Sequence, residues 1–207
     1  TVEIHEEGPR EGFQIEPGPI STVDKVKLID ALSKTGLKHI QACSFVNPRL
    51  VPGWADAEKV VESFDAHEDV EYTGLYFNGN GLDRALAFKD KLTISGSISL
   101  TASEGFTKKN LNRTHAENMA AMERHVMSHL ELGIPVNRIG VMAAFGCNYQ
   151  GDISPATVIK TLNDLEVDKL SAKINSALDE FTPETNRPLF DADSVIPVSY
   201  THLQPTR

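Results

Sequence analysis

The chain has 207 residues, of which 40% are hydrophobic and 24% charged, a balance typical of folded proteins rather than disordered ones. Acidic residues outnumber basic ones by 29 to 20, and the net charge of -9 disfavours binding to nucleic acid or to an anionic membrane. Two cysteines are too few for a disulfide scaffold, and the longest nearly apolar stretch, residues 139–147, is too short to cross a bilayer. We therefore expect a soluble, cytoplasmic protein.

Short strand-like segments alternate with helical ones along most of the chain. Since consecutive parallel strands need a crossover between them, such alternation predicts an α/β protein whose parallel sheet is open or closed into a barrel. The expected strands are residues 2–5, 37–43, 70–77, 92–100 and 135–145.

Three helices carry clear start signals. Two of them begin with a Ser or Thr that is followed three residues later by an acidic residue, which is the pattern of a capping box. The third begins with a Ser followed at once by Pro, which favours the first helical position. The expected N-cap residues are Ser21, Thr114 and Ser154.

The pattern changes after Leu165. Residues 167–181 keep a helical spacing, and the stretch from 182 to 207 is rich in Pro and Asp, with no sixth strand where the alternation predicts one. We therefore expect two segments. Residues 1–165 form a partial strand–helix domain, and residues 166–207 form a divergent or misassembled segment, helical and then irregular.

Polar residues follow the expected strands. In parallel strand–helix folds the working residues lie just past the carboxyl ends of the strands, so these positions could bind a metal and an anionic substrate. The alternative interpretation is that loop ends are polar in most proteins. The residues concerned are Arg10, Glu11, Asn78, Glu104 and Lys108.

Four sequence motifs resemble those of the 3-hydroxy-3-methylglutaryl-CoA lyase family. GPREGFQ, SFVNPRLVP, ASEGFTKKN and GCNYQGDISPATV occur in the family's order and spacing within residues 2–165. The family consists of metal-dependent (β/α)8-barrel lyases with a pyruvate carboxyltransferase-like domain. The resemblance therefore implies an incomplete (β/α)8 (TIM) barrel of about five β/α units.

The resemblance also implies a reaction, the cleavage of a 3-hydroxyacyl-CoA between C2 and C3 to give acetyl-CoA and a keto acid. Arg10 occupies the position of the arginine that stabilises charge on the thioester oxygen. Glu11 stands where the family has its metal-binding Asp, and the implied cofactor is Mg2+ or Mn2+. Gln41 replaces an acidic residue near the metal, so it acts in catalysis as a hydrogen-bonding group or only caps the strand end.

The same motifs imply an acyl-CoA binding surface. Lys108 belongs to a small basic cluster that either flanks the acyl-CoA entrance or forms a solvated loop. Cys147 is interpreted as a packing residue, and the pair His125 and His129 as surface residues on one helix face. The expected substrate-binding residues are Gln14, Ser44, Asn78, Ser103, Glu104, Lys108 and Asn110.

Several family features are absent from the sequence. It contains no Asp-Thr-x-Gly turn, no His-x-His pair and no glycine-rich loop with a catalytic Cys, so the second half of the metal site is missing. We therefore expect this apparently truncated chain to be inactive by itself, and a full-length form to be a homodimer. Two other readings stay open: a condensing synthase of the isopropylmalate or homocitrate type, and a non-catalytic binding or scaffold protein.

Overall fold

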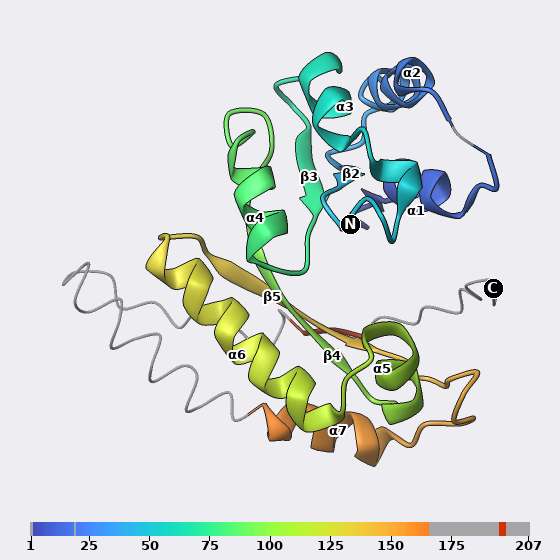
Figure 1. Cartoon of the computed structure of the whole chain (residues 1–207), viewed down its shortest axis with the longest axis vertical. Helices are drawn as coiled ribbons and strands as arrows, with labels where there is room; N and C mark the ends of the chain where they lie inside the picture. The colour runs from blue at the N-terminus through green and yellow to red at the C-terminus, as the bar shows by residue number, and fades with distance from the viewer. Residues whose placement is uncertain (1, 19, 166–194, 198–207) are drawn as a thin grey trace. The chain divides into compact units, whose positions relative to one another are not determined.

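A computed structural model describes residues 2–18, 20–165 and 195–197 (Figure 1). The internal contacts divide the chain into two units, Thr1–Ile94 and Ser95–Arg207, each of which is described here by itself. Among the described residues, no helix has both the length and the apolar character that crossing a membrane requires.

The first unit contains a three-stranded parallel sheet in the order β1-β2-β3. Its strands are β1 (His5–Glu6), β2 (His39–Ser44) and β3 (Glu71–Leu75). Its helices are α1 (Gly8–Ile15), α2 (Thr22–Leu32), α3 (Ala57–Ser63) and α4 (Gly79–Leu86), with a short 3-10 helix, η1 (Pro52–Trp54).

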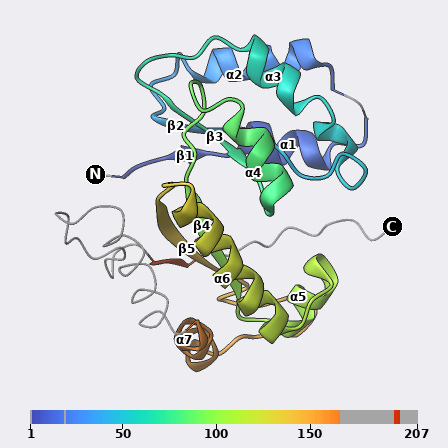
Figure 2. The ribbon, with the colours of Figure 1, turned by 60° about the vertical axis from the view of Figure 1, so that its left-hand side comes forward.

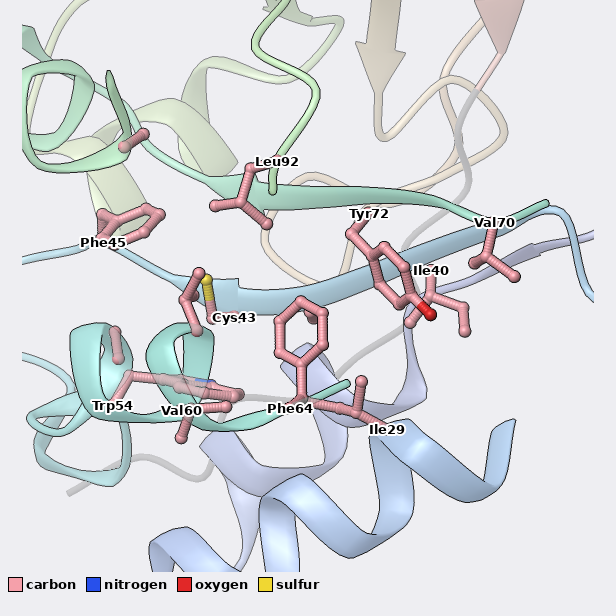
Figure 3. Packing of buried hydrophobic residues seen from close by; sticks show 14 residues of the cluster. Ile29, Ile40, Cys43, Phe45, Trp54, Val60, Phe64, Val70, Tyr72 and Leu92 are labelled. Carbon is pink, nitrogen blue, oxygen red and sulfur yellow. The ribbon is translucent and has the colours of Figure 1, made fainter. Parts of the chain in front are cut away.

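The core of this unit lies between the sheet and helices α2 and α3 (Figure 3). Ile40 projects from β2, and Ile29 from α2 and Phe64 from the end of α3 face it, each at most 1% exposed. The Phe64 ring packs against the Tyr72 ring with centroids 4.7 Å apart. Because β2 places alternate residues on this face, Gln41 and His39 point to the other face of the sheet.

The second unit contains another parallel sheet, in the order β4-β5-β6, against which α6 packs (Figure 2). Its strands are β4 (Gly96–Thr101), β5 (Val136–Met142) and β6 (Val195–Pro197). Its helices are α5 (Glu104–Leu111), α6 (His115–Glu131) and α7 (Pro155–Asp164).

The expected helix starts are confirmed. The Ser21 hydroxyl accepts a hydrogen bond from the backbone N–H of Asp24 at 3.1 Å, and Ser154 does the same for α7. At α6 the Thr114 hydroxyl accepts from the Glu117 N–H at 3.2 Å, while the Glu117 carboxylate accepts from the Thr114 N–H at 2.7 Å. Both halves of that capping box are therefore formed.

Other expectations need correction. The polar segments after β1 and β4 are not loops but the helices α1 and α5, and residues 2–4 lie outside the first strand. The tail expected to be irregular contains β6, which pairs with β5 because its backbone satisfies the open edge of that strand. The expected helix at 167–181 lies outside the described residues, and the boundary after 165 stays a prediction.

Candidate active site

Arg10 is the centre of a buried polar cluster in the first unit. The residue is only 6% exposed, and its Nε donates a hydrogen bond to Oε1 of Gln41 at 2.5 Å. Its two terminal nitrogens donate to Oε2 of Glu7, at 2.8 Å, and to Oε2 of Glu11. Every nitrogen of the guanidinium group therefore has a partner, which fixes the plane of the group.

The sequence folds locally in a way that makes this cluster possible. Helix α1 begins two residues after β1, with Pro9 in its first turn, so Arg10 lies just past the carboxyl end of that strand. Because β2 is the neighbouring parallel strand, its residue Gln41 comes within reach of the helix. The indole N–H of Trp54 donates to the backbone oxygen of Arg10 at 2.9 Å and fixes the first turn of α1 from the other side.

The charges of this cluster sum to -1, since one guanidinium ion faces the carboxylates of Glu7 and Glu11. The carboxylate of Glu11 is thus already paired with Arg10. Within the described part of the chain, Glu11 belongs to no group of three His, Cys, Asp or Glu side chains close enough to share an ion. One carboxylate already paired with an arginine does not make a divalent metal site, so the described residues do not fit the cofactor at this position.

The three other residues predicted in the first unit are not part of the Arg10 cluster. Neither Gln14 Oε1, on α1, nor Ser44 Oγ, at the end of β2, has a hydrogen-bond partner among the described residues, although both atoms are buried. Asn78 is exposed and accepts a hydrogen bond from the Gly81 N–H at 3.0 Å, which makes it the N-cap of α4. The structure therefore gives Asn78 a capping role, and it does not connect Gln14 or Ser44 with Arg10.

Ser103 is the fully buried member of the predicted residues in the second unit. Its hydroxyl accepts from the Phe106 N–H at 3.1 Å, as the N-cap of α5. The same oxygen lies 3.0 Å from Oε1 of Gln150 and 3.1 Å from Sγ of Cys147. Cys147 packs against the core of this unit, in agreement with its interpretation as a packing residue.

The remaining predicted residues, Glu104, Lys108 and Asn110, are exposed on α5. Asn110 donates to the backbone oxygen of Phe106 at 3.1 Å, within its own helix. The pKa of Glu117 lies below its usual value, chiefly through hydrogen bonds from Thr114 and further through the charges of Lys108 and Arg113. The charges of Lys108 and Arg113 therefore favour the ionised form of this carboxylate.

Sequence reasoning missed Glu7 and Gln150 as partners of the site. Glu7 precedes Arg10 by three residues, a spacing that brings two side chains together once the segment is helical. That signal was present, but it was hidden by the expectation of a loop. Gln150 meets Ser103 across 47 positions of sequence, and no local signal could have found it.

Comparison with known proteins decides the ancestry of the chain. The cytoplasmic 3-hydroxy-3-methylglutaryl-CoA lyase of Danio rerio is 38% identical over 165 residues, which are 79% of this chain and 48% of that protein. No protein-family model matches the sequence. The chain is a homologue of the hydroxymethylglutaryl-CoA lyases. It spans about half the length of the curated relatives it matches.

The solved hydroxymethylglutaryl-CoA lyases also share its fold. The Bacillus subtilis enzyme matches with a TM-score of 0.72 and 26% identity, over 96% of this chain and 76% of that chain. A lyase from Acinetobacter baumannii, solved in complex with coenzyme A and 3-methylmalate, matches with a TM-score of 0.68 and 30% identity. The match covers 84% of this chain and 53% of that chain. The prediction of an incomplete (β/α)8 barrel is therefore confirmed.

Proposed function

We propose that this chain carries the Arg10 part of an active site that cleaves 3-hydroxy-3-methylglutaryl-CoA into acetyl-CoA and acetoacetate. One observation supports this most directly. The guanidinium group of Arg10, in the GPREGFQ motif, is buried and hydrogen-bonded to Gln41 on β2, 31 positions away in the sequence. Homology to the lyases supplies the reaction, and the substrate class agrees with the coenzyme A bound by the Acinetobacter relative.

In this reaction a base removes the proton from the C3 hydroxyl, and the C2–C3 bond breaks as C3 becomes the ketone of acetoacetate. The electron pair of the broken bond passes to the thioester, and the resulting enolate is protonated at C2 to give acetyl-CoA. Arg10 is the residue of this chain suited to stabilise the enolate oxygen. Gln41 cannot take up the hydroxyl proton as a carboxylate would, so we assign it the positioning of Arg10.

The cofactor follows from homology alone. The lyases are metal-dependent, and Mg2+ or Mn2+ remains our prediction. Because Glu11 does not form a site by itself, no step above is assigned to a metal. A role of Gln14, Ser44, Ser103, Glu104, Lys108 and Asn110 in binding the acyl-CoA also remains a prediction, as does the homodimer.

The cytoplasmic location remains a prediction too. The Danio rerio relative is named as cytoplasmic, and others of similar identity are named as mitochondrial.

Activity measurements on two proteins test the proposal. The 207-residue chain is expected to release no acetyl-CoA from 3-hydroxy-3-methylglutaryl-CoA. A chimaera that joins residues 1–165 to the carboxyl-terminal half of the Bacillus subtilis lyase is expected to cleave it. In the chimaera, Arg10→Gln should lower kcat by roughly 100- to 1,000-fold, the usual cost of removing one charge-stabilising donor. Arg124→Gln, at an exposed position on α6, is the matched control.

Three outcomes would contradict the proposal. The first is a chimaera with the circular dichroism and melting behaviour of a folded barrel that does not cleave the substrate. The second is a chimaera that releases free thiol from acetyl-CoA and a keto acid, which would favour the condensing synthase. Equal activity of Arg10→Gln and Arg124→Gln would remove Arg10 from the mechanism.

A further inference from the structure

A second cluster of ligand-type side chains lies near the amino-terminal end of the first sheet. His5 begins β1, His39 begins β2 and Glu71 begins β3, and the strand register pairs His5 with His39 and His39 with Glu71. Residues in register on adjacent strands project from the same face, so these three side chains form a row. Glu3, two residues before His5, joins the row from the adjoining segment. None of these residues belongs to the Arg10 cluster.

The ligand atoms of this cluster converge on one point. Nε2 of His39 and Nε2 of His5 both approach Oε1 of Glu3, the latter at 3.5 Å. The two imidazole rings are stacked, with centroids 4.2 Å apart and planes at 17°. One ligand atom from each of Glu3, His5 and His39 lies within 4.8 Å of the others. Small movements of the exposed Glu3 and His5 side chains would bring all three into one coordination sphere.

Each nitrogen of the His39 ring faces a carboxylate. Nδ1 of His39 lies 2.9 Å from Oε2 of Glu71, and Nε2 lies against Oε1 of Glu3. Glu71 therefore holds the ring from one side, and Nε2 points toward the place where the ligand atoms of Glu3 and His5 converge. The same contact between a carboxylate and the remote nitrogen orients metal-binding histidines in known sites.

We propose that Glu3, His5 and His39 bind a divalent transition-metal ion, with Zn2+ as the preferred occupant and Glu71 as the residue that orients His39. Two imidazole nitrogens and one carboxylate suit zinc and its neighbours, whereas Mg2+ and Mn2+ favour oxygen ligands. The carboxylates of Glu3 and Glu71 balance the charge of the ion. The site is thus different in ligands and in metal from the one that homology implies, and it does not depend on the proposed lyase function.

Zinc binding to the untagged 207-residue chain tests this proposal. Titration against a chromophoric zinc chelator is expected to show one zinc ion per chain, and Co2+ is expected to give a visible absorption band. His39→Ala and His5→Ala should each weaken binding by tenfold or more, and Glu71→Gln by about tenfold, the lower end of the range seen for orienting residues. His67→Ala, which changes an exposed histidine outside the cluster, is the matched control.

A further variant separates this site from the Arg10 cluster. Glu11→Gln should leave zinc affinity unchanged, since Glu11 contributes no ligand to the proposed site. The proposal is overturned if the chain binds no zinc after dialysis against micromolar zinc. It is also overturned if His39→Ala, with an unchanged circular dichroism spectrum, binds zinc as tightly as His67→Ala does, because the cluster would then be an ion pair only.

Discussion

Lys25 is charged and yet only 2% exposed. Its Nζ donates to the backbone oxygen of Gly53 and to Oδ1 of Asp56, both at 2.5 Å, and lies 4.8 Å from the centre of the Trp54 ring. These contacts connect α2 to the segment that carries η1. Since Trp54 in turn donates to the backbone of Arg10, Lys25 supports the first turn of α1 indirectly.

We predict that Lys25→Ala lowers the free energy of unfolding by about 3–5 kcal/mol, because it leaves the partly buried carboxylate of Asp56 without its cation. Lys27→Ala, on the same helix, removes an exposed ion pair with Asp24 at 3.5 Å. This variant should change the free energy of unfolding by less than about 0.5 kcal/mol. Urea denaturation followed by circular dichroism measures both. Equal losses in the two variants would contradict the structural role of Lys25.

The partners of Arg10 and Gln41 could not be predicted from the sequence. Arg10 was recognised from a motif, yet the nature of its partners depends on which strand lies beside β1. Gln41 could be read as a catalytic group or as a strand cap, and its contact with Arg10 at 2.5 Å supports a positioning role. A residue type limits what a side chain can donate or accept, whereas its partner is chosen by the packing of distant segments.

Helix α6 shows the same division at the scale of an element. Its capping box was readable from residues within a few positions of each other. Its two histidines were expected on the surface, but His129 is 1% exposed and its Nδ1 lies 2.7 Å from the backbone oxygen of His125. The expectation was wrong because the i, i+4 spacing identifies a shared face and does not say what covers it.

The histidines of α6 predict a loss of stability in acid. Burial, followed by the nearby His129, lowers the pKa of His125 to about 4 from its ordinary value of 6.5. Between these pH values the unfolded chain binds more protons than the folded one. The contribution of His125 to stability is therefore fully present above about pH 6.5 and is lost as the pH drops toward 4.

Melting temperatures of the unmodified chain and of His125→Gln, measured near pH 7 and near pH 5, test this prediction. The melting temperature of the variant should fall less from about pH 7 to about pH 5 than that of the unmodified chain, since the variant has one group fewer to protonate on unfolding. Parallel losses in both proteins would show that His125 is not responsible.

At the scale of the whole molecule, the described residues form two hydrophobic cores, and each consists of residues of its own unit. Ile29 is fully buried in the first and Ile98 in the second. We expect Ile29→Ala and Ile98→Ala each to destabilise the unit that contains it by about 2–5 kcal/mol, through lost burial and the cavity left behind.

Amide hydrogen exchange followed by mass spectrometry separates the two effects. Ile29→Ala should raise exchange in residues 2–94 and leave the described residues beyond Ser95 nearly unchanged, and Ile98→Ala should do the reverse. If either change raised exchange equally in both units, the two cores would have to unfold as one.

The sequence by itself determined the alternation of strands and helices, the helix starts at Ser21, Thr114 and Ser154, and the kinship with the lyases. These properties depend on the identity of residues that lie close together in the chain, or on motifs that need no structure to be compared. Only the tertiary structure decided which residues meet across the sheets, including Arg10 with Gln41 and His5 with His39. Those contacts depend on strand order and register. Both arise from the packing of the whole unit, so a short segment of sequence does not reveal them.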